Sequence, residues 1–418
     1  MDIDVDEDRL RRGIERTGAF GATGGEGRGR TNLTGTPANA AVRDLLVEQM
    51  EEAGLSVTVD AVGNVRGRWT PPTADPDAAP VAAGSHLDSV PGGGIFDGPL
   101  GVYAALESVR ALQASDRALD RPVDVVSFTE EEGTRFGDGL LGSSVAAGHR
   151  DPADALAFTD DDGATLEAAL SDAGYRGEGR VDAAGWDAWV ELHVEQHTRL
   201  ERAGVPVGIV TAITGITHLE AVVEGEANHA GATPMDGRAD ALAAASEMVL
   251  DVERAAKEVV ETESETAVGT VGSLSVEPNA TNVVPDRVEA GVDVRDVEYE
   301  SMEAVVAAVR ESLDRLERDR GVDTSLERGI DLRPTPMSDR VHEAAHDAAE
   351  AQGIATLDLH SGAAHDTMHV ASVTDAGMLF APSRDGISHS PQEWTDWADC
   401  ATATRALAGT IATLASGD

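Results

Sequence analysis

The chain has 418 residues, of which 76 are acidic and 32 basic, so its formal net charge at neutral pH is −44. Its apolar fraction of 41% is too high for a disordered acidic chain, and its length predicts two or three domains with a substantial core. Such an acidic surface excludes passive binding to nucleic acid or to anionic membranes, because both need basic contacts. Lys257 is the single lysine. A large excess of acidic residues with almost no lysine indicates a protein adapted to very high salt, where dissolved ions screen the repulsion between its charges.

The chain start and the cysteine content predict a cytoplasmic protein. Residues 1–6 are acidic and lack the apolar stretch of a signal peptide. No run of about eighteen apolar residues occurs, so we expect no membrane span. Cys400 is the only cysteine, which excludes an internal disulfide and a thiolate zinc cluster, and its apolar, helical surroundings predict a buried residue.

The first half of the chain alternates predicted helices with short buried strands. Apolar residues at helical spacing predict helices at 38–53 and 100–113. Short apolar runs predict strands at 81–85, 123–129 and 188–193. Strands that alternate with helices indicate an α/β fold with a mostly parallel sheet.

The pattern changes at about residue 213 and returns to α/β character at about residue 330. Between them, strands are predicted at 213–223, 267–276 and 287–295, with long helices at 239–260 and 301–318. After them come a helix at 338–352, a strand at 376–380 and a helix at 396–415. We therefore expect one catalytic domain, made of residues 1–212 and 330–418, interrupted by an inserted α+β domain at 213–329.

A histidine and an aspartate follow the first of these buried strands. His86 lies in the run 84–90, and Asp97 lies in the glycine-rich run 92–98, which can turn sharply and bring the two side chains together. Open α/β sheets bind ligands at this edge. A phosphate loop would need Gly-Lys-Ser/Thr, and no lysine is present here. The pair predicts metal ligands, with a plain glycine turn and a capping histidine as the alternative.

Three further segments carry candidate ligands after apolar strands. In Thr129-Glu130-Glu131-Glu132-Gly133 the adjacent carboxylates repel one another, so a cation would explain them, although a solvated loop is also plausible in so acidic a chain. In 191–197, His193, Glu195 and His197 would share one face of a strand, and no His-Glu-x-x-His motif occurs in the chain. Residues 383–391 contain His389.

Together these segments predict a metal centre rather than an isolated ligand. Nitrogen and oxygen ligands without sulfur suit zinc, manganese or cobalt. A set with one shared carboxylate is sufficient for two metal ions roughly 3.5–4 Å apart, as in many hydrolases.

These motifs resemble those of the amidase (hydantoinase/carbamoylase) branch of the M20 metallopeptidase superfamily. That branch includes N-carbamoyl-L-amino acid hydrolases, allantoate amidohydrolases and β-ureidopropionases. The resemblance extends along nearly the whole chain and includes 229–235 and 277–285. It implies a metallopeptidase-like α/β catalytic domain, interrupted by an inserted lid and dimerisation domain, and a homodimer in which His229 reaches the neighbouring subunit.

The resemblance also implies roles for individual residues. The metal ligands would be His86, Asp97, Glu132, His193 and His389, with Asp97 bridging two divalent ions. Glu131 would be the general base, and Glu130 a neighbour without a direct role. Substrate contacts are implied for Gln196, His229, Asn282 and Arg295, and for the loop 361–366 with Ala363 and Ala364. His197 and Ala364 stand where the family usually has glycine, which bears on the shape of the substrate pocket and not on the reaction class.

The implied reaction is hydrolysis of the carbamoyl C–N bond of a small N-carbamoyl-L-amino acid or related ureido acid, giving the amino acid, ammonia and carbon dioxide. Glu131 would transfer the proton, His229 would stabilise the oxyanion, and Arg295 would bind the substrate carboxylate. The alternatives are an allantoate amidohydrolase or β-ureidopropionase. An aminopeptidase or dipeptidase fits the substrate-contacting residues less well, and a non-catalytic binding protein would not need the complete ligand set.

The remaining histidines have no partner motif and are expected to be structural or exposed. They are His149, His218, His342, His346, His360 and His369. His365 lies in the substrate-loop match, and a role near the site stays open for it. His197 is expected to be exposed or to lie behind the ligands.

Overall fold

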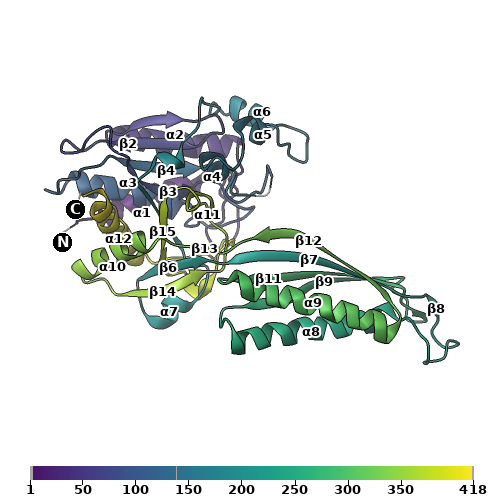
Figure 1. Ribbon diagram of the computed structural model, residues 1–418. Helices are drawn as coiled ribbons and strands as arrows, with labels where there is room; N and C mark the ends of the chain where they lie inside the picture. Colours follow the sequence, from purple (N-terminus) through teal and green to yellow (C-terminus); the bar gives the residue numbers. More distant parts are fainter. Residues whose placement is uncertain (1–2, 138, 417–418) are drawn as a thin grey trace. The chain divides into compact units, whose positions relative to one another are not determined.

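The computed structural model describes residues 3–137 and 139–416 and divides into two compact units (Figure 1). Unit 1 combines the chain up to Thr211 with the chain from Met337 onward, and unit 2 is Ala212–Pro336. Unit 2 overlaps the segment 213–329 that the sequence sets apart. Within the described residues, no helix has both the length and the apolar character needed to cross a membrane.

Unit 1 is an α/β layer structure. Its helices are α1 (Glu7–Ala19), α2 (Pro37–Glu52), α3 (Pro99–Gln113), α4 (Leu141–Ala146), α5 (Pro152–Leu156), α6 (Leu166–Asp172), α7 (Arg199–Ala203), α10 (Asp339–Ala351), α11 (Thr367–Val370) and α12 (Trp397–Ala415). Its strands are β1 (Ser56–Val59), β2 (Val65–Trp69), β3 (Val81–His86), β4 (Val123–Phe128), β5 (Ala188–Val194), β6 (Val207–Ile213), β14 (Thr356–Ser361) and β15 (Asp375–Ala381).

The sheet order is β1-β2-β4-β3-β5-β15-β6, and β14 also pairs with β6. The two-residue strand β13 (Thr335–Pro336), at the end of unit 2, pairs with Ala212 and Ile213. The four central strands β4, β3, β5 and β15 are parallel, as the alternating pattern predicts. Their nearly continuous burial fits strands that are covered on both faces. Helices α3, α12 and α10 pack on one face, and α4 and α11 on the other.

The second face of this sheet has its own aromatic core. Trp186 and Trp189 stack with ring centroids 5.4 Å apart, and Phe128 packs 5.3 Å from Trp189. The indole Nε1 of Trp189 donates to Thr367 Oγ1 at 2.7 Å, so the one polar atom of this buried ring has a partner. This contact fixes the start of α11 beneath the sheet.

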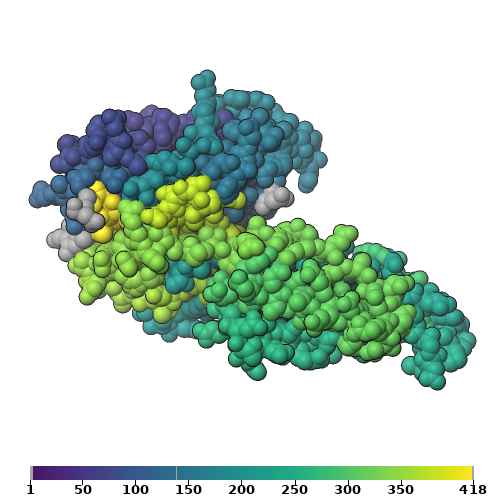
Figure 2. All heavy atoms as spheres, viewed as in Figure 1, coloured from purple at the N-terminus to yellow at the C-terminus, as the bar shows by residue number. Residues whose placement is uncertain are grey.

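Unit 2 is a four-stranded antiparallel sheet with two long helices on one face (Figure 1). In the space-filling view its atoms are coloured from teal to light green (Figure 2). Its elements are β7 (Gly215–Glu224), β8 (Asn228–His229), α8 (Ala241–Thr262), β9 (Val268–Glu277), β10 (Val283–Val284), β11 (Arg287–Asp296), α9 (Tyr299–Arg320) and β12 (Asp323–Leu332). The sheet order is β12-β7-β11-β9. In β11, Val288, Ala290, Val292 and Val294 are buried in the core shared with α8 and α9, while Arg287, Glu289, Asp293 and Arg295 alternate onto the opposite, polar face.

Candidate metal centre

The candidate ligands of unit 1 follow the carboxyl ends of its four parallel strands. His86 is the last residue of β3, and His193 lies in β5. Glu131 and Glu132 follow β4, and His389 follows β15. Because these strands are neighbours in the sheet, their ends meet at one edge, which is where α/β sheets bind ligands.

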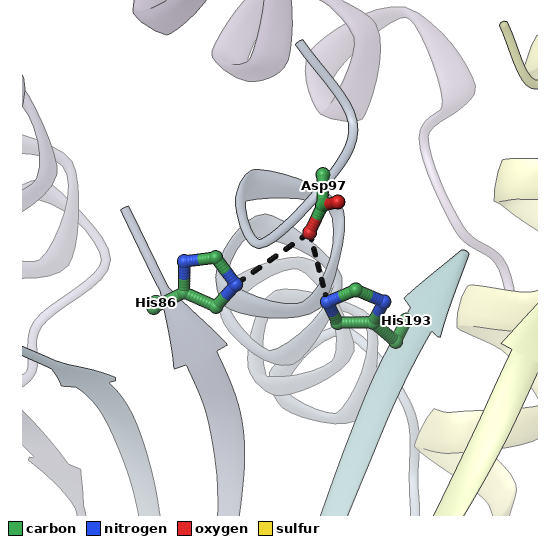
Figure 3. Close-up of side chains that lie close together, drawn as sticks. All are labelled: His86, Asp97 and His193. Carbon is green, nitrogen blue, oxygen red and sulfur yellow. Dashed lines mark ion pairs between the residues drawn. The ribbon is translucent and has the colours of Figure 1, made fainter. Parts of the chain in front are cut away.

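Asp97 lies between two buried histidines (Figure 3). Its Oδ1 is 3.6 Å from His86 Nε2 and 3.1 Å from His193 Nε2. On the other side of each ring, Nδ1 faces a main-chain carbonyl, Asp88 O at 3.3 Å and Val194 O at 3.2 Å. A proton on each Nδ1 would satisfy these carbonyls and leave each Nε2 lone pair facing Asp97.

The second oxygen of Asp97 faces a different pair of residues. His389 Nε2 is 3.4 Å from Asp97 Oδ2 and 3.3 Å from Glu132 Oε2. The His389 side chain is 51% exposed, so this half of the cluster is open to solvent. The structure thus brings all five expected ligands together as two groups, His86–Asp97–His193 and Asp97–Glu132–His389, which share Asp97.

The chemistry of this donor set fits divalent cations. The Nε2 atoms of His86 and His193 are buried and have no hydrogen-bond partner within the described part of the chain. Burial and the nearby Asp97 raise the pKa of Glu132 to about 8, because each disfavours a further negative charge. A cation bound among these groups would reverse that effect by stabilising their charged, ligating forms.

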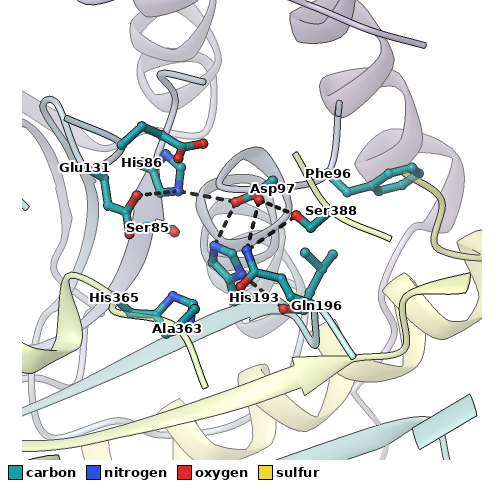
Figure 4. A network of polar contacts seen from close by, with 12 residues as sticks. Ser85, His86, Phe96, Asp97, Glu131, His193, Gln196, Ala363, His365 and Ser388 are labelled. Atoms are coloured by element: carbon teal, nitrogen blue, oxygen red, sulfur yellow. Dashed lines mark hydrogen bonds and ion pairs between the residues drawn. The ribbon is translucent and has the colours of Figure 1, made fainter. Parts of the chain in front are cut away.

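Glu131 lies at the edge of the cluster, where its Oε2 is 3.6 Å from His86 Nε2 (Figure 4). Burial raises the pKa of its carboxyl well above the usual range; His86 opposes this effect and Glu132 adds to it. By contrast, burial alone would raise the pKa of Asp97, but its contacts with His193 and His86 hold it well below its usual range. The carboxyls of Glu131 and Asp97 therefore differ in proton affinity within the same cluster.

Three side chains that the sequence analysis did not assign to this task hold Asp97 in place. Gln196 Nε2 donates to Asp97 Oδ2 at 3.1 Å, and Ser388 Oγ donates to the same oxygen at 2.6 Å (Figure 4). Glu393 Oε1 accepts from the main-chain N–H groups of Phe96 and Asp97 at 2.8 and 3.1 Å. Ser388 lies in the segment 383–391 with His389, and Glu393 follows two residues after that segment; this proximity was the one signal for them. Gln196 was expected to contact substrate.

A buried arginine holds the main chain that leads to Asp97. The Arg30 guanidinium donates to the carbonyls of Leu87 and Gly94 at 2.8 and 2.9 Å, and to those of Asp88 and Asp97 at 3.2 Å. Arg30 is fully buried. Arg30 lies in a glycine-rich segment without a recognised motif, so the sequence analysis did not predict this role.

Three non-glycine residues at the site have a left-handed backbone. Their φ angles are 57° at Glu130, 57° at Gln196 and 53° at His389. This region costs an L-residue about 1–2 kcal/mol, and residues that adopt it gather at functional sites. Glu130 Oε1 accepts from the main-chain N–H groups of Arg135 and Phe136, so it fixes the turn after Glu132. Among the described residues, no candidate metal group includes Glu130.

The expected strand face of His193, Glu195 and His197 is wrong. Strand β5 ends at Val194, and the positive φ of Gln196 turns the chain away. Glu195 instead accepts from the main-chain N–H groups at the start of α7. His197 lines a pocket of about 250 Å³ that also includes Glu195, Gln196, Arg199, Leu359, His360, Gly362 and Ala363.

The loop 361–366 approaches the cluster through His365. The His365 ring lies 4.6 Å from the His193 ring, and its Nε2 is 2.9 Å from Ser361 Oγ. Burial lowers the pKa of His365 well below the usual range, so it packs there as a neutral ring. Ala363 lies in the same loop, where its N–H donates to Ser361 Oγ at 3.2 Å, and the partly buried Ala364 follows it.

The remaining expected substrate residues belong to unit 2. His229 in β8 pairs with Val283 in β10, and the N–H of Ala230 donates to Asn282 O at 3.0 Å, so His229 and Asn282 are neighbours. His229 Nδ1 accepts from the main-chain N–H groups of Gly231 and Ala232. The ring proton is therefore on Nε2, which can donate a hydrogen bond.

Arg295 lies far from these two residues within unit 2. It is near the end of β11 and pairs with Asp293 at 3.0 Å, whereas Asn282 precedes the start of β11 at Arg287. Arg287 and Arg295 are eight residues apart on one extended strand, a separation of roughly 26 Å. One small molecule cannot contact Arg295 and His229 of the same unit 2.

Comparison with known proteins agrees with this geometry. Residues 82–413 match Peptidase family M20/M25/M40. The chain is 41% identical to N-carbamoyl-L-amino acid amidohydrolase from Geobacillus stearothermophilus, over 93% of this chain and 94% of that protein. It is 36% identical to ureidoglycolate hydrolase from Arabidopsis thaliana, over 92% of this chain and 82% of that protein.

Among solved structures, the fold is similar to a hydantoinase/carbamoylase family amidase from Burkholderia multivorans. The TM-score is 0.92 at 36% identity, and the match covers 99% of both chains. These similarities extend over nearly the whole length and so include both units. The chain therefore belongs to peptidase family M20/M25/M40 and, within it, to the hydantoinase/carbamoylase amidases.

Proposed function

We propose that this protein is a metal-dependent amidohydrolase that cleaves the carbamoyl C–N bond of a small N-carbamoyl-L-amino acid. The observation that carries the proposal is the Asp97 carboxylate, which faces two buried histidines with one oxygen and His389 with the other, beside Glu131. The name of the Geobacillus relative supports this substrate class, and that of the Arabidopsis relative supports related ureido acids. The products are the amino acid, ammonia and carbon dioxide.

Two divalent ions would be held by His86, Asp97, Glu132, His193 and His389. Zinc suits this histidine and carboxylate set best, and manganese or cobalt are the alternatives. When bound, such ions polarise a carbonyl oxygen and make water acidic enough to act as a nucleophile near neutral pH.

Glu131 is the proposed general base. Its Oε2 is 3.6 Å from His86 Nε2, at the edge of the two ligand groups that share Asp97, and Glu132 is the neighbouring carboxylate that faces His389. Glu131 would accept a proton from the attacking water and deliver it to the leaving nitrogen, which then departs as ammonia.

The substrate contacts are proposed for residues of both units. The Nε2–H of His229 would donate to the oxyanion that develops at the carbamoyl carbon. Arg295 would bind the substrate carboxylate in a bidentate fork, in competition with its present partner Asp293. Asn282, Gln196, Ala363 and Ala364 complete the proposed contacts, and the pocket beside His197 offers room for the amino acid side chain.

We also propose a homodimer, formed through unit 2, in which His229 serves the neighbouring subunit's substrate. The separation of roughly 26 Å between the two ends of β11 supports this arrangement, because Arg295 and His229 then act on one substrate only if they come from different chains. The proposal includes a cytoplasmic location, supported by the single, buried Cys400, since secreted proteins more often carry disulfides.

The proposed activity is tested by assays of the metal-loaded protein in high KCl. We expect turnover of N-carbamoyl-L-amino acids to exceed that of N-carbamoyl-β-alanine, allantoate and dipeptides, measured as released ammonia or amino acid. A preference for allantoate would reassign the enzyme within the same reaction class. Turnover of dipeptides alone would contradict the proposal and support peptidase action.

Replacement of the proposed base separates proton transfer from metal binding. Glu131→Gln should retain the bound metal and lower kcat by about 10²–10⁴-fold, because the amide cannot accept the proton. Glu132→Ala is the matched variant at the adjacent carboxylate, and it should lose metal. Steady-state kinetics and elemental analysis check both results; full metal content in Glu132→Ala would show that the two roles are exchanged.

Complementation tests the shared site. Glu131→Gln and His229→Ala homodimers should each be nearly inactive, while a mixture after subunit exchange should regain activity, because one site of each hybrid dimer is then intact. The control is Glu131→Gln mixed with Glu132→Ala. This mixture should regain no activity, because both residues act in their own subunit's site and each site of the hybrid dimer then carries one defect. No recovery in the first mixture, or a monomer by light scattering, would contradict the proposal.

The acidic composition supports adaptation to high salt as a further part of the proposal. With a net charge of −44, repulsion should destabilise the fold at low ionic strength, where the screening length reaches about 30 Å at 0.01 M salt. The melting temperature should therefore rise with KCl, and sucrose at equal osmolality should raise it less because it does not screen charge. A flat KCl profile from 0.1 M upward would argue against this adaptation.

A further inference from the structure

Two histidines on α10 and an aspartate on β14 converge at one point of unit 1, and none of them belongs to the cluster around Asp97. His342 and His346 are four residues apart, so their side chains lie on one face of the helix. His346 Nε2 is 2.8 Å from Asp358 Oδ1, and His342 Nε2 is 3.5 Å from the same oxygen. One donor atom from each residue lies within 4.8 Å of the others.

The spacing of these donors fits a tetrahedral metal ion. Zinc binds imidazole nitrogen and carboxylate oxygen at about 2.0–2.2 Å, which places neighbouring donors of a tetrahedron roughly 3.3–3.5 Å apart. The two histidine–carboxylate spacings, 2.8 and 3.5 Å, are close to these values, and the donor atoms of all three residues lie within 4.8 Å of one another. All three side chains are partly exposed, so a water molecule can complete the coordination.

A simple hydrogen bond between His346 and Asp358 is the competing explanation, and it leaves His342 unexplained. His342 Nε2 is shielded from solvent and has no hydrogen-bond partner among the described residues, although it faces the Asp358 carboxylate. Buried polar nitrogens normally have a partner. The His342 and His346 rings lie 4.7 Å apart at 66°, so both can direct a nitrogen to one ion.

We propose that His342, His346 and Asp358 form a separate site for a transition-metal ion, with zinc preferred. The ion would join α10 to β14, a strand that pairs with β6. Because β14 runs directly into the loop 361–366, the ion would clamp the strand that positions Ala363 and His365. The site is structural, and it does not depend on the reaction proposed above.

The test is zinc stoichiometry of the full-length protein. Wild type, His342→Ala and Asp358→Asn are dialysed to equilibrium against buffered, low-micromolar free Zn²⁺ in high KCl, and bound zinc is measured by elemental analysis. We expect each variant to bind one zinc ion per chain fewer than wild type. We also expect zinc to raise the melting temperature of wild type more than that of either variant.

The control is His218→Ala in unit 2. His218 Nε2 is 2.8 Å from Asp293 Oδ2, so it reproduces the histidine–aspartate pair without a second histidine, and its loss should leave the zinc content unchanged. Circular dichroism verifies that each variant is folded. For a variant that fails to fold, a zinc-edge anomalous map of wild-type crystals decides: a peak between the three side chains supports the site. Equal zinc content in wild type and folded variants, or no such peak, overturns it.

Discussion

The proposed metal centre depends on the position of one buried carboxylate, that of Asp97. Its main chain is held by two buried side chains of opposite charge. Arg30 donates to four carbonyl groups of the 87–97 segment, and Glu393 accepts from two of its N–H groups. Buried polar groups of a loop must find partners, and here they find them in fixed side chains. Asp97 can then face His193 and His389 with different oxygens, as the proposed bridging role requires.

The length of β11 sets the distance between the proposed substrate contacts of unit 2. The strand carries Arg295 near one end, while His229 and Asn282 lie beyond the other, so the proposed substrate contacts of unit 2 fall into two separate groups. A rigid antiparallel sheet with a helical layer keeps them apart by a fixed distance. In the proposed dimer, the two ends of each unit 2 sheet would contact the substrates of two different active sites.

The sequence predicted the parts of the fold that have strong local patterns. The apolar runs of β3, β4 and β5 and the long helices α8 and α9 were recognisable, and so was the mostly parallel sheet. Helix α1 was not predicted, because only Leu10, Gly13, Ile14 and Thr17 of its 13 residues are buried. Strand β12 was missed because it is mostly exposed and polar. Within the site, Arg30 and Glu393 act on main-chain groups more than 50 residues away, and no local spacing predicts such contacts.

The left-handed backbone at Glu130, Gln196 and His389 sets a limit on how this protein can change. Glycine would relieve roughly 1–2 kcal/mol of conformational cost at each position. Yet the same replacement would remove the turn-fixing carboxylate, the amide that holds Asp97, or the exposed imidazole of the second group. Stability and chemistry therefore oppose each other at these three positions. Selection for a more stable chain would have to find its gains elsewhere in the fold.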